Sequence, residues 1–77
     1  MQELIELIRQ TLDIDLELAE DTPLLSAGLV DSFGLVVLLG AIEERYSVTL
    51  DESELGVETF DTPAQILDRI QMAAVDR

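Results

Sequence analysis

Apolar residues near the start of the chain are spaced as they would be on one face of a helix. They recur at intervals of three or four, at Leu4, Ile5, Ile8 and Leu12. Leu7 widens this stripe, while the charged and amide side chains between these positions lie on the other side. The pattern therefore predicts an amphipathic helix over residues 3–12.

The next stretch, residues 13–18, alternates acidic and apolar side chains. This alternation is typical of a half-buried strand, and residues 46–50 alternate in a similar way and would be its pairing partner. The competing interpretation is an extended loop whose apolar side chains lie over the ends of helices, namely Ile14, Leu16 and Leu18. We favour the loop, because a single pair of short strands is weakly stable. Residues 21–23, Asp-Thr-Pro, mark a turn within it.

A second helix is predicted over residues 32–46, and it is apolar nearly all round in its first ten residues. Gly28 ends the preceding loop, and Asp31 suits the N-cap because its carboxylate can accept an N–H of the first turn. Ser32 would then be the first helical residue, with its hydroxyl near the exposed end. Gly34 would leave room for another group to approach beside Ser32.

The apolar character of this helix has a consequence for the surface of the domain. A domain of 77 residues is too small to bury such a helix completely, so part of it should remain available to a partner. We expect the exposed part to come from four residues: Leu35, Val36, Val37 and Leu39.

The last helix, over residues 63–74, has a clear start signal. Thr62 would be the N-cap, Pro63 the first helical residue and Gln65 the third. Thr62 and Gln65 would then form a capping box, in which each side chain bonds the backbone N–H of the other residue. The apolar stripe of this helix consists of Ile66, Leu67, Ile70 and Ala73 or Ala74.

Two short turns are predicted before the last helix. Residues 51–56 form one, closed by Gly56, and residues 57–60 form the other, with Phe60 in the core. The first turn matches a calcium-binding loop at positions 1 and 6, but positions 5 and 12 hold Leu and Thr, so no metal site is predicted. The predicted fold class is all-α: a small three-to-four-helix bundle in a single domain, residues 1–77, with a long loop between the first two helices.

Charge and composition narrow the function. The chain has 17 acidic and 4 basic residues, a net charge of −13, so nucleic acid and anionic lipid would repel it. Because 48% of its residues are apolar, it should fold rather than remain disordered. The longest uncharged run, residues 33–42, is far shorter than the roughly 20 residues of a membrane span, and the first residues do not resemble a secretory signal. We therefore expect a cytoplasmic protein that neither inserts into membranes nor binds nucleic acid.

Catalysis by this chain alone is not expected. It has no cysteine and no histidine, the commonest general base, and its basic residues are all arginine. The Ser32 hydroxyl would need a base to act as a catalytic nucleophile, but its place at a helix N-terminus suits a phosphate group. If the domain takes part in a reaction, it must carry a group that another protein attaches. The alternative is an acidic helical interaction module without a prosthetic group.

The segment around Ser32 resembles that of a known family. Residues 24–33, Leu-Leu-Ser-Ala-Gly-Leu-Val-Asp-Ser-Phe, resemble the attachment segment of acyl carrier and peptidyl carrier proteins. The order of helices and loops is similar to that family over residues 3–74. Residues 50–55 and 58–62 most resemble free-standing carriers served by adenylating enzymes, such as the D-alanyl carriers.

This resemblance implies a non-enzymatic carrier, which we expect to be a monomer. A phosphopantetheinyl transferase would move 4′-phosphopantetheine from coenzyme A onto the Ser32 hydroxyl, using magnesium, with Asp31 and Phe33 flanking the site. The thiol of this arm would hold an acyl or aminoacyl group as a thioester. An activating ligase would load the arm, and acyl-transferring or condensing enzymes of a biosynthetic pathway would use the group.

Two positions depart from the pattern of the family. The residue after the serine is most often Leu and is Phe33 here, which is a conservative exchange. Many fatty-acid carriers place acids at the positions of Gly34 and Val37 to dock basic enzymes, so their absence argues against a dedicated role in primary fatty-acid synthesis. The predicted partner-binding surface is instead an apolar patch with acids at its rim: Val36, Val37 and Leu39, with Glu43 and Glu44.

Overall fold

The computed structural model describes residues 1–51, 53 and 56–75. Within these residues it contains four α-helices, α1 (Gln2–Leu12), α2 (Ser32–Tyr46), α3 (Val57–Phe60) and α4 (Pro63–Val75). No strand occurs in this described part of the chain, so the all-α fold class is confirmed, and the three main helices lie where the sequence predicts them. The turn predicted over residues 51–56 lies largely outside the described residues.

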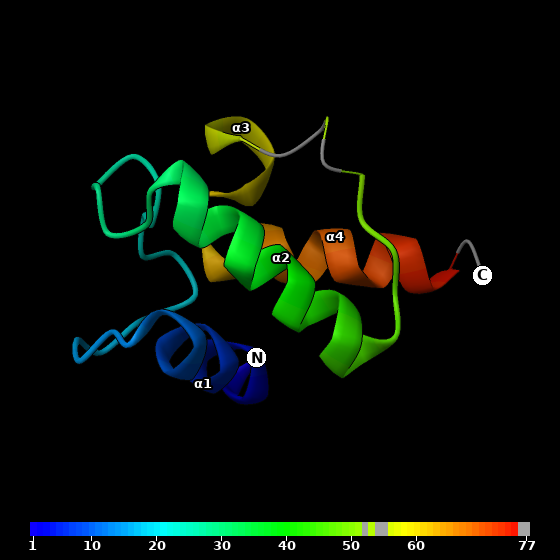
Figure 1. The fold of residues 1–77 in the computed structure, drawn as a ribbon, viewed down its shortest axis with the longest axis horizontal. Coiled ribbons are helices and arrows are strands. Elements are labelled where there is room, and N and C mark those ends of the chain that lie inside the picture. The colour runs from blue at the N-terminus through cyan, green and yellow to red at the C-terminus, as the bar shows by residue number, and fades with distance from the viewer. Residues whose placement is uncertain (52, 54–55, 76–77) are drawn as a thin grey trace.

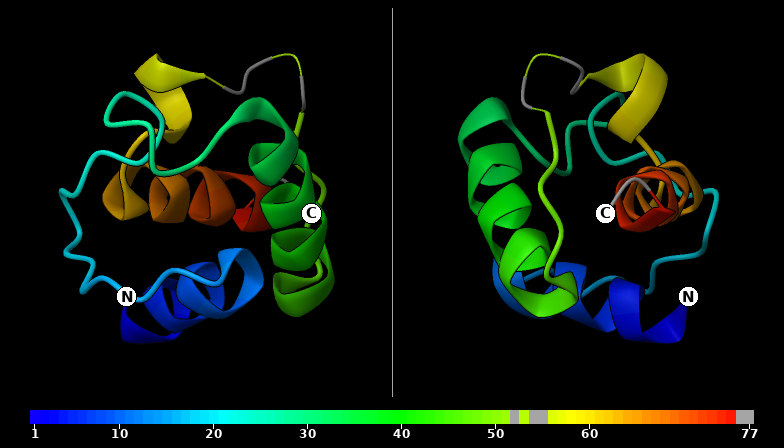
Figure 2. Two further views of the ribbon diagram at one scale, coloured as in Figure 1. Left: turned by 60° about the vertical axis from the view of Figure 1, so that its left-hand side comes forward. Right: turned by 90° about the vertical axis from the view of Figure 1, so that its right-hand side faces the viewer.

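The helices enclose one apolar core. Helix α2 crosses the middle of the view in Figure 1 and lies along one side of the molecule in both views of Figure 2. Helix α1 packs against both α2 and α4, and α3 packs against α4. The buried side chains of this core come from every helix and from the connecting segments: Leu4, Ile8, Leu24, Val30, Leu38, Leu39, Ile42, Val48, Leu50, Phe60, Ile66 and Ile70. Phe60 is therefore a core residue, as predicted, and it anchors the short helix α3.

Both long N-terminal helices end at a residue in the left-handed conformation. Asp13, with φ 54°, donates its N–H to the carbonyl of Arg9 after α1, and Ser47, with φ 55°, donates to the carbonyl of Glu43 after α2. These bonds satisfy carbonyl groups that have no partner within the last turn of a helix. The left-handed conformation of Asp13 and Ser47 turns the chain sharply after each helix.

The segment between α1 and α2 is a loop, as favoured over the strand alternative. Ile14 and Leu18 pack against the core. Leu16 is 57% exposed, so the expectation that it lies over a helix end is wrong. In an alternating segment without a partner strand, no neighbouring backbone fixes which side chains turn inward.

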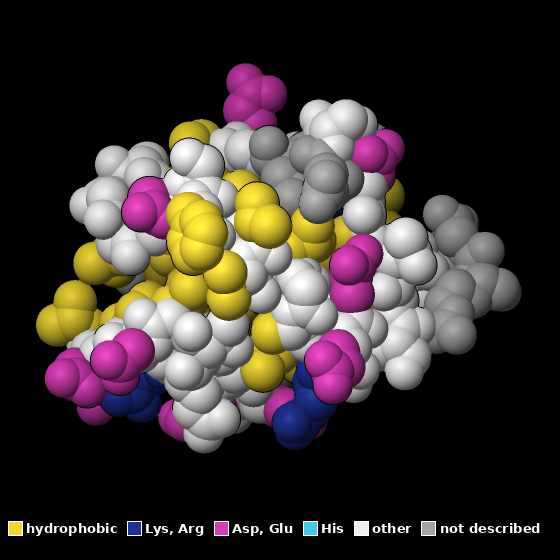
Figure 3. Space-filling model, viewed as in Figure 1, with side chains coloured by type: hydrophobic (Ala, Val, Ile, Leu, Met, Phe, Trp, Pro, Cys, Tyr) yellow, Lys and Arg dark blue, Asp and Glu magenta, His cyan; other side chains and the backbone are white. Residues whose placement is uncertain are grey.

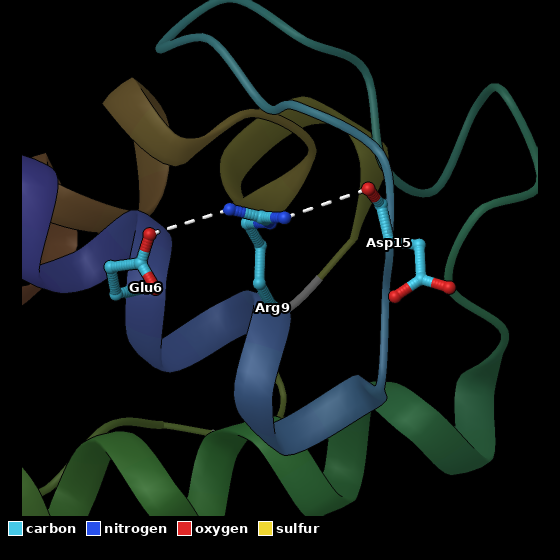
Figure 4. Close-up of polar contacts among 3 residues, drawn as sticks. All are labelled: Glu6, Arg9 and Asp15. Atoms are coloured by element: carbon cyan, nitrogen blue, oxygen red, sulfur yellow. Dashed lines mark hydrogen bonds and ion pairs between the residues drawn. The ribbon is translucent and has the colours of Figure 1, made fainter.

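Arg9 holds the first residues of this loop beside α1. Its Nη1 lies 3.4 Å from Glu6 Oε1, and its Nη2 donates to the backbone carbonyl of Asp15 at 3.5 Å, as drawn in Figure 4. The guanidinium therefore bridges the helix and the loop that leaves it. Because the side chains of Arg9 and Glu6 are partly exposed, their ion pair contributes little to stability.

The start of α4 has the predicted capping box. Gln65 donates its N–H to Thr62 Oγ1 at 3.2 Å, and Gln65 Oε1 accepts the N–H of Thr62 at 3.1 Å. The N–H of Ala64 donates to the carbonyl of Glu20 at 2.9 Å, which fastens the middle of the long loop to the same helix end. Among the described residues, no helix is long and apolar enough to cross a bilayer.

Candidate functional site

Ser32 is the first residue of α2, and its side chain is exposed. Asp31 precedes it in an extended conformation, and the Asp31 carboxylate accepts the N–H of Gly34 at 2.7 Å, so the predicted N-cap is confirmed. Among the residues that the structure describes, the Ser32 hydroxyl has no hydrogen-bond partner. It therefore lies free at a helix end where the amide groups favour a negatively charged group.

Two other serines have their hydroxyl groups engaged. Ser26 Oγ donates to Asp61 Oδ2 at 2.8 Å, and Ser53 Oγ donates to Asp51 Oδ1 at 2.7 Å. Ser47 lies at the opposite end of α2 from Ser32, in a left-handed conformation. Ser32 is thus distinguished from these three by its combination of a free hydroxyl and a helix N-terminal position.

The loop that leads to Ser32 is held in a defined shape by its backbone. The N–H groups of Leu29 and Val30 both donate to the carbonyl of Leu24, at 2.9 and 3.0 Å. Gly28 has φ 78°, a conformation that costs other residues energy, and its N–H donates to the carbonyl of Leu25 at 3.1 Å. Because Leu24 and Val30 are buried, both ends of this turn are anchored in the core.

Asp61, between α3 and α4, forms hydrogen bonds to the start of this loop. Its Oδ1 accepts the N–H groups of Leu25 and Ser26 at 2.7 and 2.9 Å, and its own carbonyl accepts the N–H of Leu24 at 2.8 Å. Asp61 is 8% exposed, so these bonds are partly shielded from water. We call this set of contacts between Asp61 and residues 24–26 the Asp61 clamp.

Hydrogen bonding favours the charged form of the Asp61 carboxylate. The bond from the Ser26 N–H is the main cause that lowers the pKa of this carboxyl below its usual value, and burial acts in the opposite direction. Sequence reasoning missed Asp61, because its partners lie 35 and 36 residues away and it directly precedes the N-cap Thr62. No local pattern distinguishes it from an ordinary acid beside a helix start.

An apolar surface extends along α2 from Ser32. Phe33 is 79% exposed, Val36 58% and Val37 42%, and Figure 3 shows hydrophobic side chains gathered over the N-terminal half of α2. Leu39, expected on this surface, is only 3% exposed and packs in the core, so that expectation is wrong. It lies on the opposite side of the helix from Val37, because two residues correspond to about 200° of rotation.

The two acids at the end of this helix have different environments. Glu43 is half-buried, and its Oε2 accepts the N–H of Leu50 at 2.9 Å, which holds the segment after α2 against the helix. Glu44 is exposed. Glu44 thus remains accessible at the rim of the apolar surface, whereas the carboxylate of Glu43 already has a structural partner.

Two glycines of α2 differ in what surrounds them. A Cβ at Gly34 would lie 3.3 Å from Asp31 Oδ1 and 3.4 Å from Val30 Cγ1, so the space expected beside Ser32 is filled by the chain itself. A Cβ at Gly40 would meet nothing within 4 Å, and Gly40 is exposed. Glycine costs a helix about 1 kcal/mol relative to alanine, and no contact described within the chain requires it at Gly40.

Comparison with known proteins agrees with this geometry. The family model described as the phosphopantetheine attachment site matches residues 2–70. The chain belongs to this family. Its cofactor is therefore covalently bound 4′-phosphopantetheine, and the protein is a carrier of acyl or aminoacyl groups rather than an enzyme.

Several individual proteins are similar to this chain. A D-alanyl carrier protein of Streptococcus suis is 31% identical over 87% of this chain and 85% of its own length. A D-alanyl carrier protein of Bacillus velezensis is 38% identical over 65% of this chain and 64% of its own length. The lincomycin biosynthesis protein LmbN of Streptomyces lincolnensis is 50% identical over 65% of this chain, which spans 18% of that larger protein.

The residues present fit the prosthetic group of this family. The Ser32 hydroxyl is free and exposed, and the amide groups of Ser32 and Phe33 have no acceptor among the described residues. The N–H of Gly34 is occupied by Asp31, which fixes the direction of the first turn. A phosphodiester on Ser32 Oγ would thus lie beside unpaired donors at the positive end of α2.

Proposed function

We propose that Ser32 is the residue to which 4′-phosphopantetheine is attached, and that the protein delivers an acyl or aminoacyl group to partner enzymes of a biosynthetic pathway. The observation that carries this proposal is the exposed Ser32 hydroxyl, which has no hydrogen-bond partner among the described residues. Ser32 is the first residue of α2 and directly follows the N-cap Asp31. When bound, the group supplies a terminal thiol that holds the acyl group as a thioester. We place this function in the cytoplasm.

The chain contributes the acceptor and its orientation, and the transferase contributes the base. Ser32 Oγ forms the new bond to phosphorus as the pyrophosphate bond of coenzyme A breaks. Adenosine 3′,5′-bisphosphate leaves, and the hydroxyl proton passes to a group of the transferase. This chain has no histidine or lysine to accept that proton. Asp31 holds the first turn of α2, and the anchored loop before it presents Ser32 to the enzyme.

The names of similar proteins support an activated carboxylic acid as cargo. Two of them are D-alanyl carrier proteins, which supports an amino acid activated by an adenylating ligase. The similarity to part of a lincomycin biosynthesis protein supports a pathway of secondary metabolism. Mass spectrometry of the holo protein isolated with its neighbouring enzymes would identify the group that the arm carries.

Partner enzymes are proposed to contact the apolar surface of α2. Phe33, Val36 and Val37 provide its centre, and Glu44 lies at its rim. Burial of one valine-sized side chain contributes roughly 1.5–3 kcal/mol, whereas an exposed ion pair contributes about 0–1 kcal/mol. Apolar contact should therefore contribute more than charge to recognition at this surface.

The attachment site is tested by modification in vitro. The protein is incubated with coenzyme A, magnesium and a broad-specificity phosphopantetheinyl transferase, and the adduct is mapped by peptide mass spectrometry. We expect one phosphopantetheine on Ser32, none on Ser32→Ala, and wild-type modification of the control Ser53→Ala, whose hydroxyl contacts Asp51. An adduct that persists in Ser32→Ala would contradict the assignment. The absence of any adduct would favour an interaction module without a prosthetic group.

A further inference from the structure

Gly40 lies at the centre of the exposed face of α2. Residues three, four and seven apart share a helix face, so Phe33, Val36 and Val37 precede Gly40 on this face and Glu44 follows it. The first three are 79%, 58% and 42% exposed, and Gly40 and Glu44 are exposed as well. The apolar surface therefore continues to Gly40, where no side chain covers the helix backbone.

No contact described within the chain accounts for a glycine at position 40. A Cβ built on Gly40 has open space around it, unlike one on Gly34, which would press against Asp31 and Val30. The position is in the interior of a helix, where alanine is more favourable. The absence of a side chain at Gly40 thus weakens the helix in the isolated protein, and it leaves the backbone open to a partner that contacts this face.

We propose that Gly40 is a site of close approach for the phosphopantetheinyl transferase, and that it determines how well this enzyme docks. This inference rests on the proposed function. The transferase must hold Ser32 Oγ within bonding distance, so its surface has to cover the start of α2. Gly40 follows Ser32 by eight residues, which is about 12 Å along the helix axis. An interface of about 800 Å² per partner extends roughly 16 Å from its centre, which reaches Gly40.

The charge of this face defines the chemistry of the transferase surface that fits it. The chain has a net charge of −13, yet no charged residue occurs from Ser32 to Ile42. The complementary surface is therefore apolar at its centre, with a pocket for Phe33 and a protruding group over the Gly40 backbone. Basic residues belong at its rim, near Asp31 and Glu44, where they would steer the acidic carrier during encounter.

The test separates docking from stability, because the substitution affects them in opposite directions. Apo Gly40→Ala and Gly40→Leu are compared with wild type for thermal melting and for modification by a broad-specificity transferase with coenzyme A and magnesium. We expect both variants to melt higher than wild type. We expect kcat/KM to fall about threefold for Ala and at least about tenfold for Leu, through KM, because the added side chain separates the surfaces.

Gly56→Ala is the matched control, since it adds the same methyl group into open space outside α2. It should leave kcat/KM unchanged. Wild-type kcat/KM in Gly40→Leu would overturn the inference and leave the proposed function standing. A failure of wild-type protein to accept the group at Ser32 would overturn the proposed function, and this inference with it.

Discussion

Removal of the Asp61 carboxylate should destabilise the whole domain, although Asp61 lies outside the helices. Asp61→Ala deletes the acceptor of the Leu25 and Ser26 N–H groups and the acceptor of the Ser26 hydroxyl. Because Asp61 is 8% exposed and its hydrogen bonds are partly buried, water can replace all of these acceptors only if the loop moves. The substitution should therefore loosen residues 24–30, which present Ser32.

The magnitude follows from the hydrogen bonds that are lost. A hydrogen bond to a charged group contributes about 1.5–3 kcal/mol, and bonds that share one carboxylate are not additive, so we expect a loss of about 3 kcal/mol for Asp61→Ala. The free energy of unfolding of a 77-residue domain is about 4–12 kcal/mol. A loss of this size lowers the melting temperature of such a domain by about 12–24 °C.

Asp61→Asn separates the charge from the hydrogen bonds. The amide retains one oxygen for the Leu25 and Ser26 N–H groups and can donate to Ser26 Oγ, so we expect a loss of about 1 kcal/mol at pH 7. The folded-state pKa of Asp61 lies below its unfolded value of about 3.9. The charged clamp therefore stabilises the protein fully above that value, and this contribution disappears as the pH falls through the folded-state pKa.

Urea denaturation followed by circular dichroism, at pH values from 7 to 3, measures both effects. The difference in unfolding free energy between wild type and Asp61→Asn should be constant near neutral pH and shrink below about pH 4. An Asp61→Ala variant that unfolds within about 0.5 kcal/mol of wild type would refute the reasoning, since this is the usual range for surface substitutions. A difference that does not change with pH would show that charge plays no part in the clamp.

Two further outcomes are expected. The melting temperature should rise when salt is raised from about 0.01 to 0.15 M. The Debye screening length then falls from about 30 to 8 Å, which weakens the self-repulsion of a chain with net charge −13. A melting temperature that stays constant or falls over this range would count against the prediction. Val37→Glu should remain folded, because Val37 is 42% exposed, and should reduce loading by the cognate ligase more than Glu44→Gln does, as measured by thioester formation on holo protein. Wild-type loading of Val37→Glu beside impaired Glu44→Gln would show that charge governs recognition.

Helix positions could be predicted because their signals are local. Asp31 and Ser32 mark the start of α2, and Thr62, Pro63 and Gln65 mark that of α4, since each N-cap acts on N–H groups within three residues. The hydrogen bonds at both starts match the prediction. The free Ser32 hydroxyl follows from the same local rule, because the first residue of a capped helix lies at its open end.

The outward face of α2 could not be predicted in the same way. Its first ten residues are nearly all apolar, so the sequence carries no contrast that tells Leu39, which is buried, from Val36, which is exposed. For the same reason, the tight packing around Gly34 could not be predicted from the sequence. The Asp61 clamp was beyond prediction for a different reason, since it joins residues that are far apart in sequence.

The Asp61 clamp also sets an order of events during synthesis. Ser32 leaves the ribosome 29 residues before Asp61 does, which at 5–20 residues per second is roughly 1–6 s. During that interval the segment before Ser32 lacks the Asp61 carboxylate that binds it, and Leu24 lacks its acceptor in the Asp61 backbone. A nascent or truncated chain thus presents the same serine on an unclosed loop, and an enzyme that recognises the closed loop will act on finished chains first.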